Sequence, residues 1–269
     1  MTALNLSYRQ IRHEPFKFTR NTEIAAVAAE VRKQLGAANR LAITLDDLKA
    51  IDKLSVNGLS YDLWVDMDRP VHDDDGNEIL GVFEFAPLSS TEAVSISVSP
   101  ANTQVGPQLV LSTAAHELGH AIYDGPGLIA GYRTRSLFDH ADSRPVQAFR
   151  LATNAQDHLQ RQSSTMPEHI LRSERRANEF MGSLLVPRDL LWQVIQEEAP
   201  KYALEIRYED TLLAASPDGN KELVWTEATY DIDTWTFTRA LAPHFGVNPA
   251  FIEIRMKRYG IMPSDTRPN

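Results

Sequence analysis

The stretch that decides the fold is LSTAAHELGHAIY, residues 111–123. In a helix, His116 and His120 lie on one face about one turn apart, because they are four residues apart. Glu117 lies next to the first histidine, displaced around the helix, where it can meet a metal-bound water without ligating the ion. This spacing predicts a zinc site with two histidine ligands and Glu117 as the general base.

The surroundings of this stretch favour a metal site over two histidines that are merely buried in a core. The segment 93–98, AVSISV, alternates with period 2 and predicts a strand before the helix. Pro107 is suited to opening the helix, and Gly125-Pro126-Gly127 is expected to end it after about Asp124. Apolar residues flank the histidines and can pack against a core; they are Ala114, Ala115, Leu118 and Ala121.

A third protein ligand is required, since a catalytic zinc normally has three and keeps one position open. The extended pattern H-E-x-x-H-x-x-G-x-x-H is not fulfilled, because Tyr123 and Pro126 occupy the places of its glycine and third histidine. Asp124 is two turns along from His116 on roughly the same face. That is too far along the axis for an easy three-point site, so Asp124 is better placed as a hydrogen-bond partner of a ligand.

Glu174 is the better candidate for the third ligand. In Glu174-Arg-Arg-Ala-Asn178 the carboxylate and the amide share one helical face. Such a pair can supply a metal contact and an orienting hydrogen bond from Asn178 to a ligand histidine. Taken alone, this spacing is common on solvated helix faces. Its position downstream of HELGH makes the ligand interpretation persuasive.

HELGH (116–120) followed by ERRANEFMGSLLVP (174–187) resembles the ImmA/IrrE family of metallopeptidases. The family pattern is a zinc-binding HExxH helix followed by a helix with E-x-x-A-N-x-F-A-x-x-L-L-x-P. The similarity extends over roughly 93–262 and includes the lead SPANTQVGPQLVLSTAA and the closing ALAPHFGVNPAFIEIRMKRYGIM. The positions in register with the second helix are Glu174, Ala177, Asn178, Phe180, Leu184, Leu185 and Pro187.

This resemblance implies one Zn²⁺ per chain, held by His116, His120 and Glu174, with Glu117 as the catalytic base. It also implies a regulatory endopeptidase, since members of the family cleave helix-turn-helix repressors and so release stress, mobile-element or phage genes. The chain departs from the family pattern in three respects. Asp124 stands where the family often has His, and Gly182 where it usually has Ala. The stretch between the motifs is longer, which predicts an insertion over 125–172.

The expected fold is α+β and zincin-like, a single domain over 1–269 in which a small, mostly antiparallel sheet packs on the HELGH helix among surrounding helices. The strand 93–98 is expected at the sheet edge, where an extended peptide could add to it. Further strands are expected over 61–67 and 79–85, and a peripheral hairpin over 202–227. Helices are expected over 21–36, 45–54, 107–124 and 174–185, after Pro187, and as a C-terminal pair within 233–262.

Composition restricts the possible functions further. The chain has 269 residues and no cysteine, which excludes disulfides, thiolate metal sites and cysteine nucleophiles. The net charge of −9 argues against direct binding of nucleic acid or an anionic membrane, and is compatible with a basic protein substrate. No apolar stretch approaches the roughly 20 residues of a spanning helix. The first residues lack the order of a signal peptide, so a cytoplasmic protein is expected.

Two other functions use the same residues. The segment 241–260 has the rhythm of a helix-turn-helix, with Arg255, Lys257 and Arg258 on its second helix, and would make the chain a DNA-binding or sensory regulator. The acidic net charge favours packing of this pair against the catalytic domain instead. Alternatively, the metal site is structural or gated by a partner. The side chain that stabilises the oxyanion stays open among His140, His158, His169, Tyr132 and Tyr230.

Overall fold

The computed structural model describes residues 2–9, 20–73, 75–85, 92–133, 146–151, 167–202, 204–209, 220–224 and 234–261. The chain divides into two compact units, Met1–Leu185 and Val186–Asn269, where the sequence analysis treats 1–269 as one domain. The first unit contains every candidate ligand. None of the described helices is long and apolar enough to cross a bilayer.

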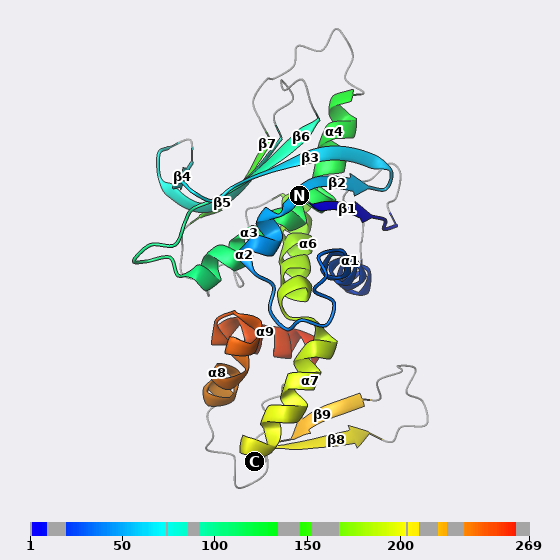
Figure 1. Cartoon of the computed structure of the whole chain (residues 1–269), viewed down its shortest axis with the longest axis vertical. Coiled ribbons are helices and arrows are strands. Elements are labelled where there is room, and N and C mark those ends of the chain that lie inside the picture. The colour runs from blue at the N-terminus through cyan, green and yellow to red at the C-terminus, as the bar shows by residue number, and fades with distance from the viewer. Residues whose placement is uncertain are drawn as a thin grey trace. The chain divides into compact units, whose positions relative to one another are not determined.

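The first unit is built on a seven-stranded mixed sheet in the order β1-β2-β3-β6-β5-β4, with β7 also paired to β5 (Figure 1). Two pairs, β1–β2 and β3–β6, are parallel, and the other pairs are antiparallel. The sheet is therefore larger and more mixed than the sequence predicts. Its strands are β1 (Thr2–Leu6), β2 (Ile51–Val56), β3 (Leu59–Asp66), β4 (Val71–His72), β5 (Glu78–Phe85), β6 (Ala93–Val98) and β7 (Val146–Leu151).

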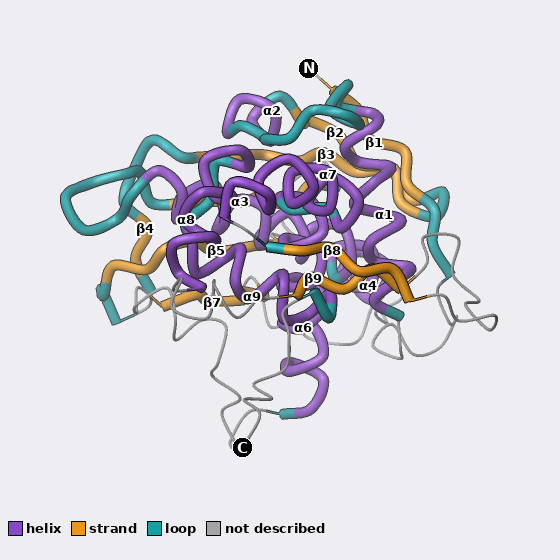
Figure 2. Tube along the Cα trace, turned by 90° about the horizontal axis from the view of Figure 1, so that it is seen from below, coloured by secondary structure: helices purple, strands orange, loops and turns teal. Residues whose placement is uncertain are grey.

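Helices cover one face of this sheet. Figures 1 and 2 show α1 and α3 on the same side of the strands. Helix α3 packs on β5 and β6, and α6 packs on both α3 and α1. This arrangement places the HELGH helix between the sheet and the helix that carries Glu174. The helices of the unit are α1 (Asn21–Gln34), α2 (Leu45–Lys49), α3 (Pro107–Tyr123), α4 (Gly125–Arg133) and α6 (Glu168–Leu185).

Helix α3 is buried almost all round, as expected for a helix between two layers. Its residues from Val110 to Tyr123 are all buried, including both histidines and the glutamate of HELGH. Pro107 occupies its first turn, where a missing N–H costs nothing. At its other end, the hydroxyl of Tyr61 donates to the carbonyl of Ala121 at 2.7 Å, and that of Tyr8 donates to Ile122 at 3.0 Å. These bonds satisfy carbonyls that a helix end leaves without partners.

One of two predicted helix ends is wrong and the other is confirmed. The helix expected over 45–54 ends at Lys49, and Ile51–Val56 forms β2 between β1 and β3. Leu48, Ile51 and Leu54 are spaced by three residues, which imitates a helical stripe. The helix expected to end after about Asp124 does so, since α3 ends at Tyr123 with Asp124 as its C-cap. A new helix, α4, then starts at Gly125, because proline fits within a first helical turn.

The predicted edge strand is also wrong. Strand β6 lies between β3 and β5, with hydrogen-bonded partners on both sides, so no peptide can add to it. Ile79 of β5 pairs with both Val71 of β4 and Leu151 of β7. A strand residue has one neighbour on each side, so β4 and β7 lie on opposite sides of β5. Part of the stretch predicted as an insertion, 125–172, is thus the strand that covers the outer side of β5.

The second unit contains α7 (Arg188–Glu198), a 3₁₀ turn (Ala199–Tyr202), the antiparallel pair β8 (Glu205–Glu209) and β9 (Asn220–Val224), and the helices α8 (Thr234–Phe245) and α9 (Pro249–Tyr259). The pair β8–β9 lies where the sequence predicts a hairpin, and α8–α9 where it predicts a helix pair. Asn248 caps α9 by accepting from the N–H of Phe251 at 2.8 Å.

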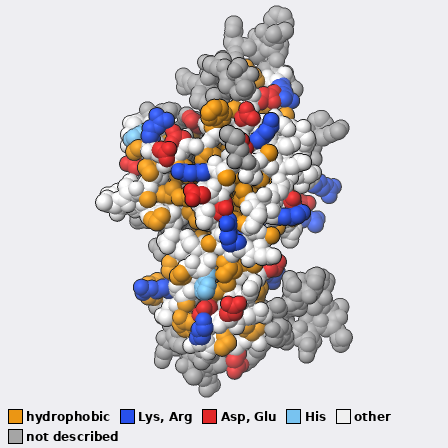
Figure 3. Space-filling model, in the orientation of Figure 1, with side chains coloured by type: hydrophobic (Ala, Val, Ile, Leu, Met, Phe, Trp, Pro, Cys, Tyr) orange, Lys and Arg blue, Asp and Glu red, His pale blue; other side chains and the backbone are white. Residues whose placement is uncertain are grey.

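The second unit does not favour the DNA-binding interpretation. Arg255 is 2% exposed and its guanidinium lies 4.4 Å from the centre of the Tyr259 ring, so it belongs to the core of the helix pair. Lys257 pairs with Glu253 at 2.6 Å. Figure 3 shows acidic and basic side chains interspersed over the visible face of the molecule. A DNA-binding surface would instead gather exposed basic side chains on one element.

Candidate metal centre

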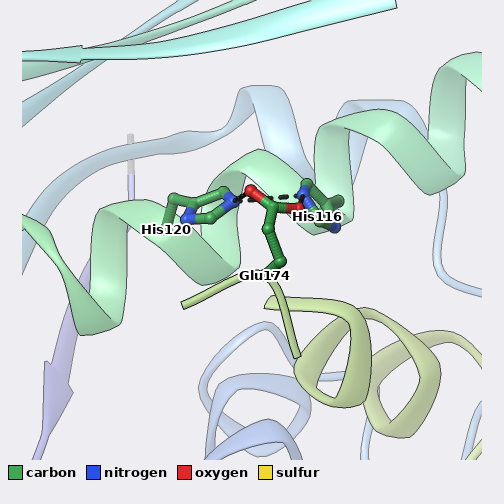
Figure 4. A group of neighbouring side chains, drawn as sticks. All are labelled: His116, His120 and Glu174. Carbon is green, nitrogen blue, oxygen red and sulfur yellow. Dashed lines mark hydrogen bonds and ion pairs between the residues drawn. The ribbon is translucent and has the colours of Figure 1, made fainter. Parts of the chain in front are cut away.

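Three side chains from two helices converge in the first unit. Figure 4 shows the carboxylate of Glu174, from α6, lying against the imidazoles of His116 and His120 on α3. The Nε2 atoms of the two histidines are 3.1 Å apart. Glu174 Oε2 lies 3.3 Å from His116 Nε2, and Glu174 Oε1 lies 3.3 Å from His120 Nε2. The two histidines are buried and the glutamate side chain is 30% exposed, so solvent reaches the group at Glu174.

The spacing of these atoms fits one metal ion. In a tetrahedral zinc site with bonds of about 2.0–2.1 Å, neighbouring donor atoms are roughly 3.3–3.4 Å apart. The two Nε2 atoms, 3.1 Å apart, and the 3.3 Å from each of them to a different oxygen of Glu174 are close to that value, and with one ligand atom taken from each residue the three atoms lie within 4.8 Å of one another. Two imidazoles and one carboxylate are donors that zinc and other divalent transition metals accept. The group could therefore hold a metal ion without rearrangement of the backbone.

The charges around the group also call for a cation. Among the residues that the structure describes, three carboxylates lie at this centre, those of Glu117, Asp124 and Glu174, together with the guanidinium of Arg176. Glu117 is 1% exposed and Arg176 is 7% exposed, so water screens these charges poorly. With neutral histidines, these four described groups together carry two excess negative charges. A divalent cation balances this excess, and an unbalanced buried charge would cost several kcal/mol.

The pKa values of the ligands reflect the same imbalance. Burial lowers the pKa of His120, but hydrogen bonds and charges from Asp124 and Glu174 outweigh burial and raise the pKa to about 10. Burial raises the pKa of Glu174, but hydrogen bonds and charges from His116 and His120 outweigh it and hold the pKa below its ordinary value. In the metal-free protein a proton on His120 thus supplies part of the missing positive charge.

Glu117 lies against the sheet, outside the group of three donors. An added Cβ on Gly81 of β5 would lie 2.6 Å from Cγ2 of Thr113 and 3.4 Å from Cγ of Glu117. The side chain of Glu117 therefore runs close to the backbone of β5, and only glycine leaves the space. Gly81 was missed by the sequence analysis. A lone glycine inside a strand pattern is the signal that could have found it, because such glycines mark close approaches.

Asp124 contacts one of the candidate ligands, as the sequence analysis expects of it. Its Oδ2 lies 2.7 Å from Nδ1 of His120, four residues earlier on the same helix. Ser173 donates to the same oxygen at 2.5 Å, and Arg176 donates to Oδ1 at 2.6 Å. Neither Ser173 nor Arg176 was among the predicted site residues. Their sequence neighbourhood offers no separate signal, since SERR reads as a solvated helix face.

Asn178 does not take the predicted role of orienting a ligand histidine. Its Oδ1 is buried without a hydrogen-bond partner among the described residues. The contact to His120 comes instead from Asp124, which α3 itself supplies one turn further on. The ring of Phe83 stacks on the same imidazole, with centroids 6.2 Å apart and planes at 21°. His120 is therefore held by neighbours on α3, α6 and β5.

None of the candidates for oxyanion stabilisation belongs to the group of three donors. Tyr132 is 39% exposed on α4 and its ring packs edge-on against Phe85. His169 is exposed near the start of α6. His140, His158 and Tyr230 lie outside the described residues.

Gly119→Ala is expected to lower the free energy of unfolding by about 1–3 kcal/mol, because the new methyl group would overpack the contact between α3 and α6. The added Cβ would lie 3.0 Å from Cα and 3.3 Å from the carbonyl oxygen of Ala177. Backbone atoms cannot move aside as a flexible side chain can. Helices α3 and α6 must therefore separate, and Glu174 would move away from the histidines. Urea denaturation and zinc titration measure the two effects.

Gly131→Ala is the matched control, since no atom lies within 4 Å of the added Cβ on α4. It should leave zinc affinity unchanged and should not destabilise the fold, because alanine favours a helix over glycine by about 1 kcal/mol. If Gly119→Ala were as stable as the parent protein, the close approach of α3 and α6 would be disproved.

No protein-family model, curated protein or solved structure matches the chain.

Proposed function

We propose that the chain is a zinc-dependent endopeptidase. The observation that carries the proposal is the convergence of His116, His120 and Glu174 at donor distances of 3.1–3.3 Å, with Glu117 adjacent on the same helix. Two histidines, one carboxylate ligand and a neighbouring general base form the donor set of a group of zinc peptidases. The spacing of HELGH and the in-register residues from Glu174 to Pro187 support the same activity.

Each residue has a distinct role in this reaction. His116, His120 and Glu174 would hold the ion, which when bound supplies a Lewis acid that polarises a carbonyl and acidifies water. Glu117 takes a proton from the attacking water and passes it to the leaving amine. Glu117 lies against β5 and outside the group of three donors, so its carboxylate is not one of the groups that would bind the ion. Burial of Glu117 favours proton transfer away from bulk solvent.

The proposed substrate is a regulatory protein, in particular a helix-turn-helix repressor. Its support is the resemblance of residues 116–120 and 174–187 to the ImmA/IrrE family, together with the acidic net charge of −9. A DNA-binding repressor is basic, so an acidic peptidase attracts it by long-range electrostatics. Direct binding of nucleic acid is not part of the proposal.

Removal of the metal tests this function. Zinc-loaded protein is incubated with unfolded casein and with a peptide library from a digested proteome, and new termini are identified by mass spectrometry. Cleavage is expected with the loaded protein, at least about tenfold less after treatment with 1,10-phenanthroline, and restored by added zinc. A protein that binds zinc but cleaves no member of either substrate set would refute the peptidase proposal and leave a structural or partner-gated metal centre.

A further inference from the structure

Helix α6 approaches the metal centre with three polar residues on one short segment. Glu174 faces the imidazoles of His116 and His120. Ser173 and Arg176, which lie on either side of Glu174 in the sequence, both donate hydrogen bonds to the carboxylate of Asp124. One turn of α6 therefore contacts α3 at two places, directly through a candidate ligand and indirectly through Asp124.

The two oxygens of Asp124 have different partners. Oδ2 lies 2.7 Å from Nδ1 of His120 and also accepts from Ser173, while Oδ1 accepts from Arg176 at 2.6 Å. The guanidinium therefore fixes the plane of the carboxylate without competing for the oxygen that faces the imidazole. Arg176 is 7% exposed and the side chain of Asp124 is 13% exposed, so solvent weakens this pair little.

This arrangement determines which nitrogen of His120 would face a bound metal ion. A hydrogen on Nδ1 donates to Asp124, which leaves the lone pair on Nε2. Nε2 is the atom that lies 3.1 Å from His116 Nε2 and 3.3 Å from Glu174 Oε1. A carboxylate on the far nitrogen of a ligand histidine fixes the tautomer and ring orientation, and its loss typically costs 10–100-fold in metal affinity.

We propose that Arg176, assisted by Ser173, is a positioning residue of the metal centre. It holds Asp124 so that His120 presents Nε2 to the ion, and it does so from the same helix turn that supplies Glu174. The second histidine ligand and the carboxylate ligand are thereby placed by one segment of α6. This inference rests on the proposed metal centre and adds to it a residue that touches neither the metal nor the substrate.

A purely structural ion pair between α3 and α6 would behave differently. Such a pair contributes to the free energy of unfolding, but its removal leaves the metal affinity of the folded protein unchanged. Metal affinity and the electronic spectrum of bound Co²⁺ therefore separate the two roles. Both readouts are independent of peptidase activity, so the inference stays testable if no substrate is found.

The first test compares Arg176→Gln with Arg172→Gln. Arg172 also lies on α6 and pairs with Glu168, away from the donor group. Zinc dissociation constants are measured by competition with a chromophoric chelator, and Co²⁺ absorption bands are recorded. We expect Arg176→Gln to bind zinc about 10–100-fold more weakly with shifted Co²⁺ bands, and Arg172→Gln to match the parent protein. Arg176→Lys, which keeps a cation near Asp124, should recover most of the affinity.

A double-mutant cycle gives the second test. If Arg176 acts through Asp124, the double variant with Asp124→Asn and Arg176→Gln should bind zinc within about twofold of Asp124→Asn alone. If the double variant instead lost zinc affinity by the product of the two single losses, Arg176 would not act through Asp124. Thermal unfolding of the metal-free variants is the folding control. A lower melting temperature with unchanged zinc affinity and Co²⁺ spectrum would overturn the inference, whereas a parent protein that binds no zinc would overturn the proposed function itself.

Discussion

Glu174→Ala should lower the zinc content of the purified protein from about one ion per chain to almost none. The variant removes the carboxylate that lies 3.3 Å from both ligand imidazoles and leaves two histidines on a single helix. If three ligands share an apparent binding free energy of about 10 kcal/mol or more, losing one weakens binding on the order of 10²–10³-fold. Elemental analysis of the protein and chelator competition measure the loss.

Glu168→Ala is the matched control for this experiment. Glu168 lies six residues earlier at the start of α6, and its exposed side chain pairs with Arg172. Its removal should change neither zinc content nor the melting temperature appreciably, because exposed pairs contribute about 0–1 kcal/mol. Tight zinc binding by Glu174→Ala would show that the third ligand is a different residue, and Asp124, which already contacts His120, is the next candidate.

Glu117→Gln is expected to lower kcat for peptide cleavage by about 10²–10⁴-fold while zinc affinity changes less than about threefold. An amide has nearly the shape of the carboxylate and can still pack beside Gly81, but it cannot accept a proton from water. The variant therefore separates the general base from the ligand set. Steady-state kinetics on a peptide cleaved by the parent protein, together with zinc titration, provide the measurement.

Glu168→Gln makes the same chemical change outside the site and should keep full activity. Unchanged kcat in Glu117→Gln would exclude Glu117 as the base. Loss of zinc together with activity would show a role of Glu117 in metal binding, contrary to its place outside the three donors.

Local pattern predicted the elements that carry the ligands. The apolar residues around HELGH and those from Ala177 to Leu185 recur with helical periodicity over several turns. Both segments are helices, α3 and α6. Helix α6 begins earlier than expected, at Glu168. Alternation over 93–98 predicted β6 with its observed bounds. These elements can be predicted because the spacing of their apolar residues matches the period of the face that each element buries.

Strand order was not predictable in the same way. Strand β1 has five residues, and its parallel register places Leu4 beside Leu54 of β2, fifty residues away. Strand β7 pairs with β5 across more than sixty residues, with Ala148 opposite Phe83. Neither segment has a periodic signature of its own, because a short strand acquires its hydrogen bonds and its buried face only from its neighbours. The position of β6 inside the sheet likewise depends on its neighbours, β3 and β5, and not on its own residues.

By itself, the sequence determined which side chains could form a metal site, because i,i+4 spacing places two imidazoles on one helix face wherever that helix lies. Tertiary structure alone decided how the site is supported. Ser173 and Arg176 read as a polar helix surface, and Asp124 as the end of another helix. The packing of α6 on α3, in which Gly119 closely approaches Ala177, buries Arg176 and partly buries Ser173 and Asp124. Charged groups that lose water must pair with each other, so this contact turned ordinary surface residues into the support of His120.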